Sequence, residues 1–381
     1  MTDPAPDIPF SRIEKLLSQL VAFETVSAQS NLVLIDWVEA FLQDAGFTTT
    51  RIAARAEDKA GLLARFGSGD GGVLLSAHSD VVPVVGQAWS TDPFTLTQRG
   101  DRLVGRGATD MKGFIACVLA LAETLRAAPP AHPVMITLSW DEELGCRGIP
   151  QMIDQVIPTL GQPDLCIVGE PTLMRLGTGH KGKASYRATC HGTPGHSAMA
   201  PRFTNALHLA ADLINALRAE QARLAAEGAR EEGHDIPYST VHAGRLSGGV
   251  ALNIVPERAE LEFEIRHLAA DDPEAILARI QADLPEGIEI ACTGSYPGLQ
   301  ADPRDPAFAA LRACLPEPAP VNVSYGTEAG FFAALNIPTL VCGPGTMRDG
   351  HQPDESIARS ELRLCARVLN GLVRDVSAGP L

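Results

Sequence analysis

Two kinds of hydrophobic pattern divide the chain. In the first part, an apolar run rich in β-branched residues predicts a strand at residues 134–138, and further short segments predict strands at residues 47–52, 61–66, 73–77 and 165–168. Apolar residues at helical spacing predict helices at residues 11–23, 31–45, 111–127 and about 149–160. This alternation of strands and helices predicts an α/β domain with a mixed, mostly parallel sheet and helices on both faces.

The pattern changes near residue 179. Polar and apolar residues alternate in the next strands, at residues 181–191, 240–246 and 258–266, as in half-exposed antiparallel strands. With helices at 205–227 and 273–284 and a strand at 287–293, the order is β-α-β-β-α-β, which is ferredoxin-like. The α/β pattern then returns, with helices at 306–315, 328–335 and 357–376 and a strand at 339–342. We therefore expect a discontinuous first domain, residues 1–178 and 294–381, with an α+β domain, residues 179–293, inserted into it.

Composition narrows the classes of function. The chain has 381 residues, enough for two domains, and its net charge of −15 argues against a basic nucleic-acid-binding surface. Apolar stretches such as residues 114–122 are much shorter than the roughly 20 residues of a membrane span. The first ten residues have neither the basic region nor the apolar core of an export signal, and the 8 cysteines contain no CxxC pair. We expect a cytoplasmic protein with reduced thiols and no nucleic-acid or membrane partner.

Three adjacent acids follow the strand predicted at residues 134–138. They are Asp141, Glu142 and Glu143. A buried strand that carries acids at its C-terminal end places charge where open α/β sheets bind ligands. On an extended backbone, neighbouring side chains point to opposite sides, so Glu142 and Glu143 can do different work. Taken alone, such a cluster is more often a solvated acidic loop.

Other segments of the first domain also end in residues of the metal-ligand type. His78 follows the strand at 73–77, Asp110 precedes a helix, Glu170 follows the strand at 165–168, and His351 follows a glycine-rich turn. Each has a purely structural alternative: an edge histidine, a helix N-cap for Asp110, or a loop acid. Because several of them follow predicted strands, we expect them to meet at one edge of the sheet.

Five of these residues form a nitrogen and oxygen donor set that suits zinc, cobalt or manganese: His78, Asp110, Glu143, Glu170 and His351. Three carboxylates with neutral imidazoles nearly balance two divalent ions, which favours a two-metal site bridged by one carboxylate. Asp80, two residues after His78, can hold the second ring nitrogen of the imidazole. Glu142 is then the candidate general base for the attacking water.

The motifs around these residues resemble those of a known family. SAHSDVVP, GRGATDMKG, SWDEELG, VGEPT, GTPGHSA, NIVP and GHQPDE occur in the order found in a dizinc metallopeptidase family. That family includes acetylornithine deacetylase, succinyl-diaminopimelate desuccinylase, aminoacylase and glutamate carboxypeptidase. The resemblance implies that His78, Asp110 and Glu170 hold one ion, and that Asp110, Glu143 and His351 hold the other. It also implies that Asp110 bridges the two ions and that the peptide bond between Asp110 and Met111 is cis. The implied metal is zinc, with cobalt as the alternative.

The second domain resembles the lid or dimerisation domain of the family, which implies a homodimer. His196 matches the histidine that polarises the scissile carbonyl, commonly from the partner subunit, and Asn253 and Arg266 match substrate-binding positions. An arginine fork is chemically suited to a substrate carboxylate. The structural alternatives are a helix-capping histidine at His196 and a surface ion pair at Arg266.

Within the family, the segment VSYGTEAGFF and the VCGPG before His351 are most similar to acetylornithine deacetylases. The implied reaction converts N2-acetyl-L-ornithine to L-ornithine and acetate, in arginine biosynthesis. Glu328 is then expected to bind the side-chain ammonium of the substrate. The structural alternative is an acid that is simply favoured at the start of a helix. Gly326 and Gly330 depart from the Cys and Pro that some of these enzymes carry. The alternatives are a succinyl-diaminopimelate desuccinylase, a broader N-acyl-amino-acid deacylase, a dipeptidase, or a non-catalytic metal-binding or partner-binding relative.

Overall fold

The computed structural model describes residues 8–55 and 58–375. Residues 1–7, which form most of the N-terminal segment without an export signal pattern, and Val376, the expected end of the last helix, lie outside the described residues. The chain divides into two compact units, which are described separately. The first unit contains Met1–Gly179, Ala301–Val323 and Thr327–Leu381, and the second contains His180–Gln300 and Ser324–Gly326.

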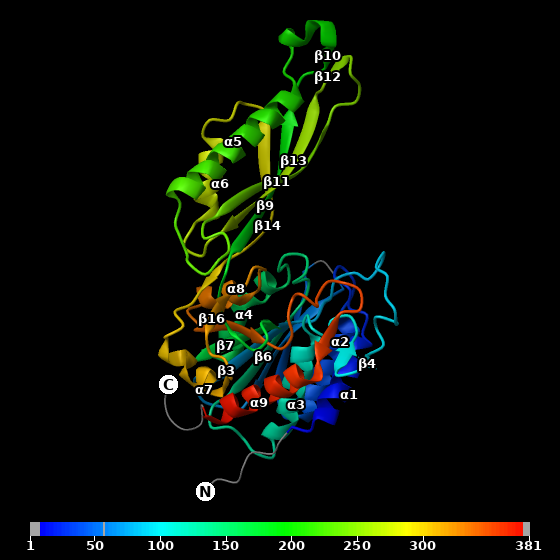
Figure 1. Ribbon diagram of the computed structural model, residues 1–381, viewed down its shortest axis with the longest axis vertical. Coiled ribbons are helices and arrows are strands. Elements are labelled where there is room, and N and C mark those ends of the chain that lie inside the picture. Colours follow the sequence, from blue (N-terminus) through cyan, green and yellow to red (C-terminus); the bar gives the residue numbers. More distant parts are fainter. Residues whose placement is uncertain (1–7, 56–57, 376–381) are drawn as a thin grey trace. The chain divides into compact units, whose positions relative to one another are not determined.

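The first unit contains a mixed sheet in which strands follow the order β1-β2-β6-β3-β7-β17-β8, with β16 beside β8 (Figure 1). The strands are β1 Thr48–Ala53, β2 Ala60–Phe66, β3 Val73–His78, β6 Val134–Ser139, β7 Leu165–Pro171, β8 Leu176–His180, β16 Pro320–Asn322 and β17 Thr339–Gly343. Strand β3 is parallel to both β6 and β7, and β17 is parallel to β7. Strands β1, β2 and β6 pair antiparallel at one edge. The predicted mostly parallel sheet is confirmed.

Helices cover both faces of this sheet. They are α1 Phe10–Val21, α2 Leu32–Asp44, α3 Lys112–Leu125, α4 Ile153–Leu160, α7 Ala309–Cys314, α8 Ala329–Ala334 and α9 Arg359–Asp375. Helices α1, α3 and α9 lie side by side on one face, and α4 and α8 lie on the other (Figure 1). Helix α3 is buried along its first three turns because the sheet covers one side and α1 and α9 cover the other.

Two predicted helices begin differently from expectation. The helix expected from residue 149 opens with a separate 3₁₀ turn, Ile149–Gln151, and the helix expected from residue 306 opens with the 3₁₀ turn Pro306–Phe308. Both turns carry a proline in their first two positions, where its fixed φ suits a helix start and its missing N–H costs nothing. Short 3₁₀ turns are common at such helix N-termini.

A small sheet with the order β18-β5-β4 was not predicted. It contains β4 Thr97–Arg99, β5 Arg102–Val104 and β18 Ser356–Ala358. Ser356 pairs with Val104, so the segment after His351 lies against the loop that leads to Asp110. The expected helix start at residue 357 is therefore wrong, because residues 356–358 form a strand before α9 begins at Arg359. Strands of three residues are too short to show a clear alternation.

The second unit has the β-α-β-β-α-β order that the sequence predicts. Its main elements are β9 Gly182–His191, α5 Ala206–Glu227, β11 Thr240–Gly248, β13 Arg258–His267, α6 Pro273–Gln281 and β14 Ile288–Tyr296. Shorter elements are β10 Gly195–His196, the 3₁₀ helix Ser197–Arg202, β12 Ile254–Val255 and β15 Leu299–Gln300. The antiparallel sheet has the order β11-β13-β9-β14, and helices α5 and α6 share a core with it. Over residues 8–55 and 58–375, no helix has the length and apolar character needed to cross a membrane.

We expect Gly169→Ala to destabilise the first unit. Gly169 lies in β7, and a Cβ added there would come within 2.1 Å of the Phe114 ring of α3. The buried helix has no room to retreat, so overpacking should cost about 1–3 kcal/mol of unfolding free energy in urea denaturation. Gly294→Ala in β14 is the control, because nothing lies within 4 Å of a Cβ there. Equal stabilities for the two variants would contradict this packing.

Candidate metal centre

Three adjacent parallel strands present the candidate residues. In the order β6-β3-β7, His78 is the last residue of β3, Glu170 lies near the end of β7, and Glu142 and Glu143 follow β6. The carboxyl ends of parallel strands lie at one edge of the sheet, where open α/β sheets bind ligands. The buried Asp110 stands just before α3, and His351 stands in the loop between β17 and β18.

The five candidate ligands form two groups that share Asp110. His78 Nε2 lies 3.0 Å from Asp110 Oδ1 and 3.5 Å from Glu170 Oε1. His351 Nε2 lies 3.0 Å from Asp110 Oδ2 and 3.0 Å from the carboxylate of Glu143. Within each group, one ligand atom per residue lies within 4.8 Å of the others. Two groups of imidazole nitrogen and carboxylate oxygen donors that share one carboxylate fit two divalent ions.

The charges of this cluster also favour cations. Burial raises the pKa of Glu143 to about 7, and it raises the pKa of Glu142 and of Glu170 well above the usual value. Hydrogen bonds with Asp110 and Glu143 raise the pKa of His351 to about 10. Burial thus disfavours the charged form of these carboxyl groups in the absence of cations. Four carboxyl groups face two imidazoles here, and divalent ions are suited to balance the carboxylates in their charged form.

The acids after β6 lie in a turn. The strand ends at Ser139, Asp141 has a φ of 51°, and the carbonyl oxygen of Glu142 accepts the amides of Gly145 at 2.8 Å and Cys146 at 2.7 Å. The expectation that Glu142 and Glu143 continue an extended strand is therefore wrong. The left-handed backbone at Asp141 ends the extended segment before this turn. Glu143 consequently meets His351, whereas Glu142 Oε1 accepts a hydrogen bond from the Cys146 thiol at 3.3 Å.

Asp141, to which the sequence assigned no role, anchors this turn. Its carboxylate forms an ion pair with Lys59, and both side chains are only 4% exposed. The other oxygen of Asp141 accepts the amide of Ala28 at 3.0 Å. Nothing in the local pattern identifies Lys59 as a buried partner, because it lies in a charged segment that is typical of a surface.

Asp80 makes more contacts than the sequence suggests. The acceptor nearest to His78 Nδ1 is the backbone oxygen of Asp80, at 2.9 Å, while the carboxylate lies at 3.5 Å. The carboxylate accepts the Ser27 hydroxyl at 2.6 Å and the amides of Glu142 at 3.1 Å and Glu143 at 3.4 Å. Asp80 therefore links the imidazole of His78 to the backbone of both glutamates.

The loop before α3 has the unusual geometry that the family resemblance implies. The Asp110–Met111 peptide bond is cis, which confirms that expectation. Three amides of this loop point to the carboxylate of Glu355, a buried residue that the sequence analysis did not single out although it closes the GHQPDE motif.

Three predicted site residues lie in the second unit. His196 is exposed, and its Nδ1 accepts the amide of Ala198 at 3.1 Å, so it caps the 3₁₀ helix as its structural alternative proposes. Its Nε2 takes no part in that bond. The carbonyl of Asn253 accepts the amide of Ser197 at 3.1 Å, which places Asn253 beside His196. Arg266 lies on β13, where it donates to Glu264 at 2.9 Å and to the Tyr296 hydroxyl at 3.0 Å.

Tyr296 also explains why glycine, and not the cysteine of some related enzymes, stands at residue 326. A Cβ added to Gly326 would lie 2.2 Å from the Tyr296 hydroxyl. The tyrosine therefore occupies the space that a side chain at residue 326 would need. Glycine at this position and tyrosine at 296 depend on each other, and the same hydroxyl contacts Arg266.

Glu328 lies in the first unit, directly before α8. It is 2% exposed, it does not cap the helix, and within the described part of the chain its Oε1 has no hydrogen-bond partner. Burial raises the pKa of Glu328 to about 7. A buried acid oxygen without a partner requires an explanation, and a bound cationic group is one.

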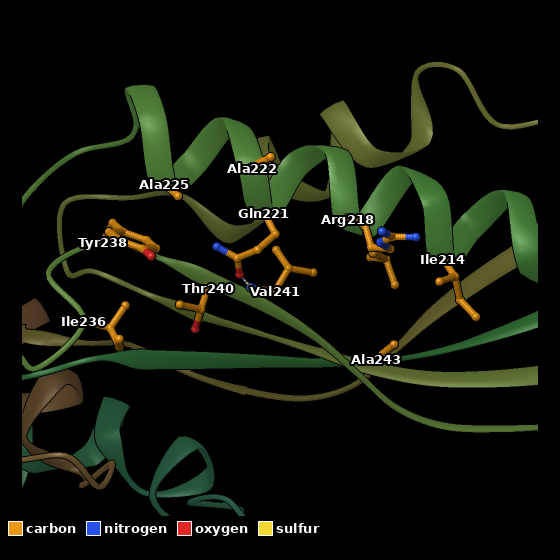
Figure 2. A pocket seen from close by; sticks show the side chains of 11 residues that line it. Ile214, Arg218, Gln221, Ala222, Ala225, Ile236, Tyr238, Thr240, Val241 and Ala243 are labelled. Atoms are coloured by element: carbon orange, nitrogen blue, oxygen red, sulfur yellow. Dashed lines mark hydrogen bonds between the residues drawn. The ribbon is translucent and has the colours of Figure 1, made fainter.

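A separate hollow lies in the second unit. It has a volume of about 520 Å³, and Figure 2 shows its walls on α5 and on the segment that enters β11. Most of its side chains are apolar, and Gln221 is held by the amide of Val241. None of the predicted site residues lines this hollow, and it lacks the acid and imidazole groups of the metal cluster.

Comparisons with known proteins place this arrangement in context. Residues 74–375 match the model of Peptidase family M20/M25/M40. The chain is 33% identical over 376 residues to acetylornithine deacetylase of Proteus mirabilis, covering 95% of this chain and 96% of that protein. It is 34% identical over 358 residues to acetylornithine deacetylase of Erwinia tasmaniensis, covering 90% and 92%.

Solved structures show the same fold at low sequence identity. A tripeptidase from Staphylococcus aureus has a TM-score of 0.76 at 17% identity, covering 98% of this chain and 100% of that chain. An M20 family metallo-carboxypeptidase from Sulfolobus solfataricus has a TM-score of 0.76 at 18% identity, covering 95% and 98%. A dinuclear metal-binding M20 peptidase from Bacillus subtilis has a TM-score of 0.69 at 16% identity, covering 97% and 98%.

We expect Asp141→Asn to destabilise the protein although the asparagine oxygen can still accept the amide of Ala28. The substitution leaves the buried Lys59 ammonium without its carboxylate, which should cost about 3–5 kcal/mol in urea denaturation. The double variant Lys59→Met/Asp141→Asn removes both charges and should recover more than half of that loss. Additive effects of the two single substitutions in the double-mutant cycle would contradict the pairing.

Proposed function

The chain belongs to Peptidase family M20/M25/M40, and on this basis we propose that it removes the acetyl group from N2-acetyl-L-ornithine. Its membership of this family, together with its similarity to acetylornithine deacetylases, identifies the protein as a metal-dependent hydrolase of amide bonds. The observation that supports the proposal most directly is the pair of ligand groups that share Asp110. Glu142 directly precedes Glu143, one of these ligands. The substrate follows the relatives of 30–34% identity, all named acetylornithine deacetylase.

In this proposal, His78, Asp110 and Glu170 hold one divalent ion, and Asp110, Glu143 and His351 hold the other. Zinc is the favoured metal because the donor set contains imidazole and carboxylate groups, with cobalt as the alternative. When bound, the ions lower the pKa of a water molecule to about 7 and polarise the substrate carbonyl.

Glu142 moves the proton. Its carboxylate takes a proton from the attacking water, whose oxygen forms the new bond to the acetyl carbon. The carbon–nitrogen bond then breaks, and Glu142 gives the proton to the departing nitrogen, which leaves L-ornithine and acetate. The amides that Asp80 holds fix the start of the turn that carries Glu142. Asp80 is therefore a positioning residue in this scheme.

The remaining roles belong to residues that bind the substrate. His196 donates a hydrogen bond to the oxyanion through Nε2, since Nδ1 already accepts a backbone amide. Asn253, which lies beside His196, binds the substrate as well. Arg266 pairs with the substrate carboxylate, and Glu328 accepts the side-chain ammonium. The buried oxygen of Glu328 without a hydrogen-bond partner in the described chain supports this last assignment.

The second unit is proposed to be an inserted lid and dimerisation domain, which the sequence placed at residues 179–293. Strand β11 forms one edge of its antiparallel sheet, and most of its residues are exposed. Beyond it, Val250 is 87% exposed and Leu252 is fully exposed. An unprotected edge strand with exposed apolar side chains suits pairing with a second copy of the chain. The eight free cysteines are consistent with the cytoplasm as the working compartment.

We expect Glu142→Ala to lower kcat by about 10²–10⁴-fold, since a general acid–base group contributes a factor of this size. Two metal ions per chain should remain bound, because Glu142 is not among the proposed ligands. Steady-state kinetics and elemental analysis of the same preparation provide the measurement. Glu142→Gln, which keeps the shape but cannot take the proton, should behave alike. A kcat near that of the unmodified enzyme would remove Glu142 from the mechanism.

A comparison of kcat/KM among substrates tests the specificity. N2-acetyl-L-ornithine should exceed N-succinyl-diaminopimelate and N-acetylmethionine by at least about tenfold, which corresponds to about 1.4 kcal/mol. The physical reason is that only acetylornithine combines a small acyl group with a cationic side chain opposite Glu328. If acetylmethionine or a dipeptide were hydrolysed equally well, the assignment as an acetylornithine deacetylase would fail while amide hydrolysis would stand.

A further inference from the structure

Glu355 lies at the centre of a buried set of hydrogen bonds beside the metal centre. It directly precedes β18, and its side chain is 1% exposed. Oε1 accepts the amides of Thr109 at 2.9 Å and Asp110 at 3.0 Å, and Oε2 accepts the amide of Gly107 at 3.1 Å. One carboxylate therefore holds three amides of the short loop that ends in the shared ligand.

Arg106 extends this set toward the second imidazole. Its Nη1 donates to Glu355 Oε2 at 2.6 Å, and its Nη2 donates to Gln87 Oε1 at 2.5 Å. The amide nitrogen of Gln87 donates in turn to the backbone oxygen of His351 at 3.0 Å. The guanidinium also lies 5.0 Å from the centre of the Trp89 ring. A continuous chain of contacts therefore connects the backbone of Asp110 with the backbone of His351.

The chemistry of these contacts depends on a carboxylate. All four groups that point at Glu355 are N–H donors, and a carboxylate has only acceptor atoms. An amide in its place would turn an N–H₂ group toward at least one N–H donor. The carboxylate also neutralises Arg106, which is fully buried. Hydrogen bonds that involve a charged partner are about twice as strong as neutral ones.

We propose that Glu355 is a positioning residue of the metal centre. It fixes the backbone of the Asp110 loop and, through Arg106 and Gln87, the backbone of His351. Two of the three donors in the group Asp110, Glu143 and His351 are thereby held at binding distance before an ion arrives. This inference rests on the proposed function and adds to it a residue that positions Asp110, the ligand of both ions, and His351, a ligand of one of them.

Titration of the full-length protein with Co²⁺ tests the proposal. Glu355→Gln should weaken the binding of the ion held by Asp110, Glu143 and His351 by about 10–100-fold, as replacement of an outer partner of a ligand typically does. The other ion should be weakened less, because Asp110 is its only ligand that Glu355 positions. The visible absorption of the bound cobalt should change, because the geometry around the second ion changes. Excess Co²⁺ should restore much of kcat, and KM should stay unchanged. Glu355→Asp, which keeps the acceptor atoms, should show a smaller loss of affinity than Glu355→Gln.

Glu220→Gln is the matched control. Glu220 lies on α5 in the second unit, is 6% exposed and is bound by Arg223 and Arg279. Its replacement should lower Tm and leave both cobalt affinities unchanged. If Glu355→Gln does not fold, Gln87→Ala removes the link to His351, together with the acceptor for Arg106 and for the Trp89 indole, and leaves the amides on Glu355 in place. It should weaken the binding of the ion held by His351 at least about threefold.

Three results would overturn the proposal, and they are distinguishable. Wild-type cobalt affinities and spectrum in the folded Glu355→Gln variant, or in Gln87→Ala, would remove Glu355 from the metal centre while the proposed function stands. An equal loss of affinity in Glu220→Gln would make the effect one of general stability. An unmodified protein that binds fewer than two Co²⁺ ions would contradict the proposed function itself.

Discussion

The structure depends on one buried carboxylate that meets two imidazoles. Asp110 is 4% exposed, and its two oxygens each lie 3.0 Å from a histidine, Oδ1 from His78 and Oδ2 from His351. A buried carboxylate is costly unless charged partners and hydrogen bonds surround it. Segments that are far apart in the sequence must therefore be held in register around it, which the parallel strands β3, β6 and β7 and the start of α3 do.

Two buried ion pairs hold the loops that connect these strands and helices near the site. Lys59 with Asp141 anchors the turn after β6, and Arg106 with Glu355 anchors the loop before α3. Such pairs contribute little net stability compared with apolar contacts, because both charges lose their water. Their value here is geometric, since a site with several ligands works only when its supporting side chains are locked. The first unit thus contains both the sheet that carries the candidate ligands and the ion pairs that hold the loops at the edge of this sheet.

The sequence predicted the parts of this arrangement that have local signals. Apolar runs mark β3, β6 and β7, and the candidate ligands His78, Glu143 and Glu170 lie at or soon after the ends of these strands, so the edge of the sheet could be anticipated. The other two ligands lie in recognisable motifs, Asp110 before a helix and His351 after a glycine-rich turn. The pairings of Lys59 and of Glu355 join segments far apart in the chain and have no local signal. The strands of the small β18-β5-β4 sheet are too short for alternation to show, and the turn at Asp141 requires a left-handed φ that the residues alone did not indicate.

The central claim is that two metal ions share Asp110. The most direct measurement is anomalous X-ray scattering at the zinc edge from crystals of the zinc-loaded protein. The account predicts two peaks about 3.5–4 Å apart, one on each side of the Asp110 carboxylate. A single peak, or peaks that do not contact Asp110, would contradict it.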